Sequence, residues 1–291
     1  MLHRYILHND SIREASEPSL TAGQVGLLSG WGVFSTLRVV EGVPFAFERH
    51  WARLTRDAGS LHIPLPHDPE SVRRKLMELI EANRAERSTL RLVVVRNCGG
   101  LWEGPRPSGP PSDLIALTAD SKDWGAGVKL AYVKQARHAA SPFTGTKILS
   151  WAMNLTWMEA AQARGFDEVI LLNERGEVAE CTSANIFMAA GKQVFTPPLS
   201  AGCLPGITRE LLLEAIRVPG IRITEKTILP AELESADEVF ITSTTRNLLP
   251  VLQVEEKKLG SAETVVPVLE RAFEEFVKRY TAQQKSLPAA R

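Results

Sequence analysis

Two residues with reactive side chains, Lys147 and Glu180, lie in sequence surroundings that could change the reactivity of the amine and place the carboxylate beside it. Lys147 follows a loop broken by Pro142 and Gly145 and precedes a long apolar segment, so its amine is expected at the mouth of a buried element. Desolvation there would favour the neutral, nucleophilic amine. Glu180 lies on the second of two strand-like segments around the turn 173–176, and an acid brought to the same place is the partner that a pyridine ring nitrogen needs. The pair predicts a lysine-dependent site.

Three places could bind a phosphate group. Gly206-Ile207-Thr208 opens a predicted helix, where free N–H groups and the helix dipole favour an anion. Thr242 to Thr245 gather hydroxyl groups after a strand, and Arg53 could give the bidentate contact that phosphate prefers. Each has an ordinary alternative: a glycine-rich loop before a helix, a solvated turn and a surface arginine. From the residues alone these alternatives stay open.

Several other site classes are excluded. The segment Gly145-Thr146-Lys147 lacks the upstream glycine and the following hydroxyl of a P-loop, and neither a nucleophile elbow nor an H-E-x-x-H motif occurs. Six scattered histidines and three distant cysteines offer no metal-ligand spacing, so no metal site is predicted.

The bulk composition is that of an ordinary globular protein. Of 291 residues 44% are hydrophobic and 23% charged, and 34 basic residues balance 34 acidic ones, so no nucleic-acid partner is indicated. Neither a signal peptide nor an apolar run long enough to span a membrane is visible, so no membrane partner is expected. We expect a cytoplasmic protein whose cysteines are free and mostly buried.

The first 120 residues are predicted to form a small α/β domain. The segment 47–59 has an apolar stripe at helical spacing, and Glu41-Gly42 suits a hairpin turn within 33–46. The 97–111 loop is too rich in glycine and proline for regular structure. Further strands are expected at 3–8, 89–96 and 113–119, with a second helix at 69–83.

Residues 121–127 are predicted to be an interdomain linker, and 128–291 a larger domain. Segment 148–164 is apolar nearly all round and is expected to be a buried helix, whereas the tail from Thr281 is expected to fray. Strands are expected at 128–134, 168–172, 178–181, 185–189, 193–196, 221–225 and 237–242, and further helices at 207–217, 230–235 and 262–280.

Five longer motifs stand out in the sequence. They are G-V-F-S-T-L-R at 32–38, F-E-R-H-W-A-R-L at 47–54, E-x-x-x-x-N-I-F at 180–187, L-P-G-I-T-R at 204–209 and A-D-E-V-F-I-T-S-T-T-R-N-L-L-P-V at 236–251. These motifs resemble those of the class IV (fold-type IV) pyridoxal-phosphate aminotransferases, which include branched-chain and D-amino-acid aminotransferases and aminodeoxychorismate lyases. The similarity covers nearly the whole chain and implies an α+β fold of two domains, the larger with a mostly antiparallel, β-barrel-like core.

The resemblance implies pyridoxal 5'-phosphate as cofactor and gives each residue a role. Lys147 would form the internal aldimine and then serve as general base and acid, and Glu180 would keep the pyridine nitrogen protonated. Arg53 would bind the phosphate, together with Ile207 and Thr208 at the helix start and with Thr244.

On the substrate side the resemblance implies Arg38, Arg91 and Thr245. Family members are homodimers, and loop residues of the neighbouring subunit can reach the site, for which the 97–111 loop is the candidate here. The expected substrates are an amino acid and a 2-oxo acid.

Departures from the family pattern leave two reactions open. The Y-x-R of branched-chain enzymes reads Thr89-Leu90-Arg91 here, Ala152 replaces a tyrosine after the lysine, and Ser35 replaces an acid common among the transaminases. Ser35 favours the lyase branch, whereas L-P-G-I-T-R favours transaminases. We therefore expect an aminotransferase, with aminodeoxychorismate lyase as the alternative. A non-catalytic relative is disfavoured because both Lys147 and Glu180 are present.

Overall fold

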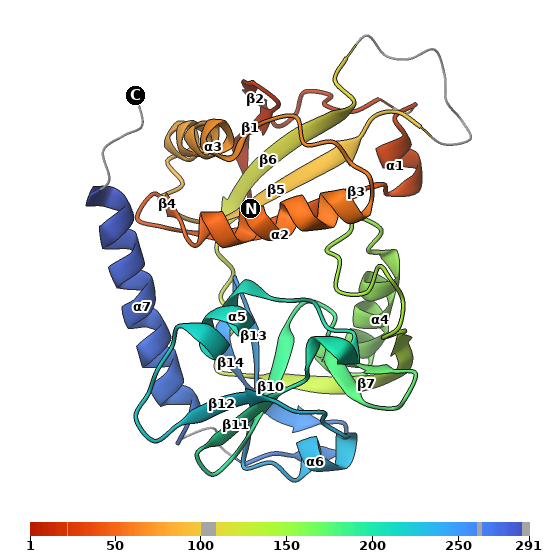
Figure 1. Ribbon diagram of the computed structural model, residues 1–291, viewed down its shortest axis with the longest axis vertical. Helices are drawn as coiled ribbons and strands as arrows, with labels where there is room; N and C mark the ends of the chain where they lie inside the picture. The colour runs from red at the N-terminus through yellow and green to blue at the C-terminus, as the bar shows by residue number, and fades with distance from the viewer. Residues whose placement is uncertain (22, 100–108, 261–263, 287–291) are drawn as a thin grey trace. The chain divides into compact units, whose positions relative to one another are not determined.

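A computed structural model describes residues 1–21, 23–99, 109–260 and 264–286 (Figure 1). The chain forms two compact units. Unit 1 comprises Met1–Lys122, Thr146–Trp151 and Arg279–Arg291, and unit 2 comprises Asp123–Gly145 and Ala152–Lys278. The chain first crosses between Lys122 and Asp123, within the segment expected as a linker. The segment that contains Lys147 belongs to unit 1 rather than to the unit that surrounds it in sequence.

Unit 1 is built on one antiparallel sheet with the strand order β2-β1-β6-β5-β3-β4. β3 and β5 pair along their whole lengths, from Gly32 opposite Val95 to Val40 opposite Arg87. β4 covers only the last two residues of β3, so the beginning of β3 has an open edge. The strands are β1 (Leu2–His8), β2 (Ser11–Glu14), β3 (Gly32–Val40), β4 (Val43–Pro44), β5 (Arg87–Arg96) and β6 (Ser112–Asp120).

Two helices cover this sheet, α2 (Phe47–Ser60) against β3 and α3 (Pro69–Asn83) against β1 and β6. α3 begins where the sequence places it, because the Asp68 side chain accepts the Ser71 N–H and Pro69 occupies the first turn. A shorter helix, α1 (Val25–Ser29), contacts β5. The apolar stripe of α2 packs into the core of the unit, where each buried leucine contributes about 1.5–3 kcal/mol. The buried stripe consists of Phe47, Trp51, Leu54 and Ala58.

Unit 2 holds a mixed sheet with the order β12-β11-β10-β13-β14-β7-β8-β9, and β15 pairs with β14. Five strand pairs are antiparallel, whereas β11–β12, β14–β7 and β7–β8 are parallel. β9 and β10 are far apart in the strand order but only residues 182–184 join them, so the sheet curls back on itself. The strands are β7 (Val128–Arg137), β8 (Glu168–Asn173), β9 (Val178–Cys181), β10 (Asn185–Ala190), β11 (Gln193–Thr196), β12 (Arg222–Glu225), β13 (Glu238–Ser243), β14 (Asn247–Val254) and β15 (Lys257–Lys258).

Among the helices of unit 2, α4 contacts β8 and α5 contacts β12 and β13. α7 begins in unit 2, where the buried Glu238 carboxylate accepts N–H groups from Thr264, Val265 and Val266 and so caps the helix. The elements are α4 (Ala152–Ala163), η1 (Leu199–Ala201), α5 (Ile207–Glu214), α6 (Pro230–Glu234) and α7 (Val266–Ser286).

Two expectations about helices were wrong. α4 starts at Ala152 rather than at 148, and it is mostly exposed: Met153 retains 66% and Leu155 53% of its accessible surface. α7 continues to Ser286 instead of fraying from Thr281, because Thr281 is buried and Lys285 pairs with Glu41. β2, α1, β14 and β15 were not anticipated. In the described ranges no helix has the length and apolar character needed to cross a membrane.

Candidate functional site

Lys147 is held by backbone pairing to the open edge of β3. The Phe34 N–H donates to the Lys147 carbonyl at 3.0 Å, and the Leu149 N–H donates to the Gly32 carbonyl at 2.9 Å. Val33 and Ile148 form the antiparallel bridge between these two bonds. The lysine is therefore fixed as if on a short extra strand of the unit 1 sheet, although the sequence around it is that of a loop.

Gly32 makes this pairing possible. A β-carbon at this position would lie 2.3 Å from Leu149 Cδ1 and 2.7 Å from the Val94 carbonyl oxygen, closer than atoms can approach. The absence of a side chain at Gly32 lets the Lys147 segment and β5 both lie against the start of β3.

Helix α2 presents a second, polar stripe beside its apolar one. His50, Arg53 and Asp57 are spaced three and four residues apart, so they share one face, and they retain only 1%, 7% and 1% of their accessible surface. The Asp57 carboxylate accepts the backbone N–H of Lys147 at 3.1 Å and also pairs with Arg56. The sequence reading found Arg53 but missed its two neighbours, which the helical spacing could have revealed.

Ser35 of β3 joins two members of this stripe. Its hydroxyl lies 2.8 Å from His50 Nδ1 and accepts a hydrogen bond from Arg53 Nη2 at 3.1 Å. Burial lowers the pKa of His50 well below its usual value, and the nearby charges of Arg53 and Lys147 lower it further. The imidazole is therefore neutral, and Arg53 supplies the positive charge.

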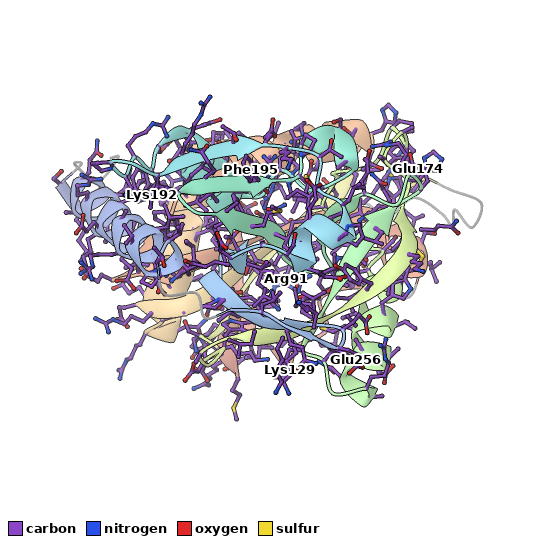
Figure 2. All side chains as sticks on the ribbon, turned by 90° about the horizontal axis from the view of Figure 1, so that it is seen from below. Arg91, Lys129, Glu174, Lys192, Phe195 and Glu256 are labelled. Atoms are coloured by element: carbon purple, nitrogen blue, oxygen red, sulfur yellow. The ribbon has the colours of Figure 1, made fainter. Side chains whose placement is uncertain are left out.

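The ring of Phe34 lies under two cations. Lys147 Nζ is 4.5 Å and the Arg91 guanidinium carbon 4.0 Å from its centroid, distances at which the ring face attracts a cation. Arg91, which comes from β5 and is labelled in Figure 2, has its pKa lowered by burial. Among the residues that the structure describes, Arg91 has no ion-pair partner. Unit 1 thus brings Lys147, Arg53 and Arg91 into one cationic region, and Arg38 from the same β3 lies over the Phe45 ring.

In unit 2, Glu180 of β9 is a buried and firmly oriented carboxylate. It retains 7% of its accessible surface, accepts from Arg137 Nε at 3.1 Å and accepts the Leu204 N–H at 3.0 Å. Burial raises the pKa of the adjacent Cys203 thiol to about 12, with a smaller contribution from the Glu180 charge. A carboxylate fixed in this way can hold a proton on a ligand nitrogen placed against it.

The start of α5 is the anion candidate of unit 2. Gly206 precedes the helix, and a β-carbon there would lie 2.0 Å from Asn185 Oδ1, whose amide in turn donates to the Leu204 carbonyl. Ile207 and Thr208 are buried in the first turn. In the described part of the chain no side chain caps this end of α5, so its N–H groups and dipole can serve a ligand.

The turn 244–246 between β13 and β14 carries the remaining predicted residues. Thr244 and Thr245 are half-buried, and Thr245 Oγ1 lies 3.4 Å from Ser243 Oγ. Arg246, which the sequence reading passed over, anchors the turn: it pairs with the fully buried Glu168 at 3.1 Å and lies 3.9 Å from the Trp124 ring centroid.

The predicted site residues therefore divide between the units. Unit 1 contains Lys147, Arg53, Arg38 and Arg91. Unit 2 contains Glu180, Ile207, Thr208, Thr244 and Thr245.

Other predictions concern the loop, the cysteines and metals. Residues 100–108 of the predicted 97–111 loop lie outside the described residues. All three cysteines are free, two of them buried, as expected. The described residues contain no cluster that could hold a metal ion.

Comparisons with known proteins define the class. The amino-transferase class IV family model matches residues 32–254. A putative branched-chain-amino-acid aminotransferase of Methanocaldococcus jannaschii is 31% identical, with 82% of this chain and 83% of the relative covered. A D-alanine aminotransferase of Bacillus licheniformis is 30% identical, with coverages of 88% and 90%. An aminodeoxychorismate lyase of Bacillus subtilis is 27% identical, with 87% of each covered.

Solved structures agree on the fold. The branched-chain aminotransferase of Thermoproteus uzoniensis, crystallised with norvaline, superposes with a TM-score of 0.87 at 25% identity, with 98% of each chain covered. The chain belongs to the class IV aminotransferase family, and the predicted α+β fold of type IV is confirmed. Enzymes of this family use pyridoxal phosphate. In unit 1 the buried Arg53 has the charge that a phosphate group requires, and in unit 2 the uncapped start of α5 and the oriented Glu180 have the chemistry that a phosphate group and a ring nitrogen require.

Proposed function

We propose that the protein exchanges an amino group between an amino acid and a 2-oxo acid, with Lys147 as the residue that holds the cofactor and moves the proton. The placement of Lys147 carries the proposal. Its backbone is bound to β3 and to Asp57, and its amine lies over Phe34 in the same unit as the buried Arg53. When bound, pyridoxal phosphate supplies a carbonyl for covalent attachment of amines and a ring that accepts electrons.

Each remaining residue has one task in this proposal. Arg53, Ile207, Thr208 and Thr244 bind the phosphate group. Glu180 holds a proton on the ring nitrogen, and the amine of Lys147 moves a proton between the substrate Cα and the cofactor carbon C4′.

The cofactor assignment is tested by spectroscopy of the purified protein. We expect a Schiff-base absorption band that sodium borohydride abolishes, with the reduced cofactor mapped to Lys147. Lys147→Ala should reduce the turnover rate by at least the factor of about 10²–10⁴ that a positioned general base contributes. Glu180→Gln should keep the cofactor and react more slowly. Wild-type turnover by Lys147→Ala would rule out the mechanism.

Arg91 supports a substrate with a carboxylate. Its guanidinium is partly buried and lies over the Phe34 ring, as the amine of Lys147 does. Within the described part of the chain it has no ion-pair partner, and a guanidinium suits bidentate contact with a carboxylate. Arg38 and Thr245 are proposed to lie toward the substrate as well. Arg91→Gln should raise KM for a 2-oxo acid more than it lowers kcat if the contact is equal in ground and transition states.

Elimination of pyruvate from aminodeoxychorismate is the second candidate reaction. Ser35, at the place of a common transaminase acid, favours it, and a lyase is among the relatives. Purified protein supplied with aminodeoxychorismate but no 2-oxo acid separates the two. Release of 4-aminobenzoate and pyruvate would replace the transaminase proposal, whereas amino transfer between an amino acid and a 2-oxo acid without that release supports it.

A homodimer is also proposed. Met153 and Leu155 of the largely apolar α4 are exposed in the single chain, and a second copy would cover such a face. Light scattering after size exclusion should give twice the mass of 32.0 kDa, and Leu155→Glu should shift it toward one chain. A monomeric wild type would refute the proposal. The cytoplasmic location stays a prediction.

A further inference from the structure

Unit 1 contains a buried hydrogen-bonded chain of Arg53, Ser35 and His50, of which Ser35 and His50 have no task in the proposed reaction. Arg53 Nη2 donates to Ser35 Oγ at 3.1 Å, and Ser35 Oγ lies 2.8 Å from His50 Nδ1. Ser35 and His50 each retain 1% of their accessible surface. Ser35 comes from β3 and the other two come from α2, so the chain also ties the helix to the strand beside Lys147.

The hydrogen-bond pattern fixes which nitrogen of His50 carries the hydrogen. The Ser35 oxygen already accepts from Arg53, and its own hydrogen has one acceptor among the described residues, His50 Nδ1. Ser35 therefore donates to Nδ1, and the hydrogen of the neutral ring is on Nε2. With the hydrogen on Nε2, the buried Nε2–H is unpaired among the described residues. The opposite tautomer would leave two buried groups unpaired, the Ser35 hydroxyl hydrogen and the Nε2 lone pair, and is therefore the more costly of the two.

The neutral ring is what this chain of bonds requires. A protonated His50 would carry hydrogens on both nitrogens, so Nδ1 could not accept from Ser35. The ring would also place a third positive charge beside Arg53 and Lys147. Burial and these two cations keep the imidazole uncharged.

We propose that Ser35 and His50 are positioning residues for Arg53: the imidazole orients the Ser35 hydroxyl, and the hydroxyl holds the guanidinium in one orientation for an incoming phosphate ester. The inference rests on the proposed function, in which Arg53 binds the cofactor phosphate. An arginine has a long, flexible side chain, so a pre-oriented guanidinium loses less freedom when it binds. Neither Ser35 nor His50 needs to touch the phosphate.

The affinity of the cofactor-free protein for pyridoxal phosphate and for pyridoxal, which lacks the phosphate, tests the proposal without any turnover. Arg53→Ala should reduce the preference for the phosphate ester strongly, and Ser35→Ala should reduce it about 5- to 30-fold, the loss expected for one or two weakened bonds. Ser88→Ala is the matched control, because it removes a hydroxyl from the fully buried Ser88 on β5, which donates to the Ala85 carbonyl. It should leave the preference unchanged.

Two substitutions at His50 separate positioning from packing. Asn carries an oxygen on Cγ, where histidine carries Nδ1, so His50→Asn can still accept from Ser35. His50→Leu fills the space without an acceptor. We expect His50→Leu to lose the phosphate preference as Ser35→Ala does, and His50→Asn to recover most of it. Equal losses in both variants would overturn the proposal.

Nitrogen NMR of wild-type cofactor-free protein gives a readout independent of ligand. We expect a neutral His50 with its hydrogen on Nε2, and a hydrogen on Nδ1 would overturn the proposal. The variants Arg53→Ala and Ser35→Ala also distinguish a failure of phosphate binding by Arg53 from a failure of its positioning by Ser35 and His50. If Arg53→Ala leaves the phosphate preference intact, the role of Arg53 in the proposed function fails. If Arg53→Ala lowers it but Ser35→Ala does not, only the positioning role fails.

Discussion

The carboxylate of Asp57, at the far end of α2, accepts the backbone N–H of Lys147 at 3.1 Å across 90 residues of sequence. Asp57 retains 1% of its accessible surface, so this bond lies in the interior of unit 1. Together with the pairing to β3 it fixes the backbone from which the reactive amine extends. The helix that carries Arg53 therefore also sets the position of Lys147.

Asp57→Ala should lower the free energy of unfolding by about 1–3 kcal/mol, because it leaves the Lys147 N–H without its acceptor. Chemical denaturation measures this. Asp57 also pairs with Arg56, which is half-exposed, so Arg56→Ala serves as the control and should cost less than about 1 kcal/mol. If the two variants lose the same stability, the pair with Arg56 rather than the bond to Lys147 accounts for the contribution of Asp57 to stability.

Gly32→Ala should destabilise the protein by about 1–3 kcal/mol and reduce turnover, because the new methyl group must displace Leu149 or β5. The control is Gly59→Ala on α2, where a β-carbon meets nothing within 4 Å. That change should be neutral or stabilise by about 0.5–1 kcal/mol, as expected for alanine in a helix. Thermal unfolding with activity assays on both variants checks the pair, and an unaffected Gly32→Ala would contradict the pairing of Lys147 with β3.

Much of the local structure could be predicted because its causes are local. The helix 69–83 has its cap, its first-turn proline and its apolar spacing within fifteen residues, and its bounds agree with α3. The stripe from Phe47 to Ala58 similarly predicts α2 and the face that it buries. Lys147 and Glu180 belong to common residue types, and only their neighbourhoods make them candidates: a loop broken by proline and glycine before an apolar segment, and a strand after a turn.

The rest depends on contacts between residues distant in sequence. Nothing around Lys147 shows that it will pair with β3, because that pairing depends on the open edge beyond β4 and on Gly32. The apolar composition of α4 predicts burial, but a single chain leaves it exposed. The ion pair of Arg246 with the buried Glu168 joins residues 78 positions apart, so the sequence around Arg246 does not indicate it.

Glu168→Gln should be one of the most damaging substitutions outside the reactive residues. Its carboxylate is fully buried, pairs with Arg246, and accepts from the hydroxyls of Thr182 and Ser183. Removing one partner of a buried ion pair costs about 3–5 kcal/mol, because the other charge stays buried. Glu232→Gln, which breaks an exposed pair with Lys226, should cost less than about 1 kcal/mol.

Urea denaturation compares these two variants. A loss below about 1 kcal/mol in Glu168→Gln would show that Arg246 finds another partner. Because Arg246 belongs to the turn 244–246, we also expect weaker binding of pyridoxal phosphate by Glu168→Gln than by Glu232→Gln.

The buried His50 should make stability depend on pH in a defined direction. Its pKa is lowered in the folded protein, so the unfolded chain takes up a proton near the ordinary value of 6.5 while the folded chain does not. Proton binding therefore stabilises the unfolded state as the pH falls below about 6.5. This residue alone then lowers the folding stability by up to about 1.4 kcal/mol per pH unit. His50→Asn lacks the titrating group, whereas the carboxylates are common to both proteins. Urea denaturation between pH 7.5 and pH 5 should show wild type losing stability more steeply than His50→Asn, and parallel curves would mean that the folded protein protonates His50 as readily as the unfolded chain does.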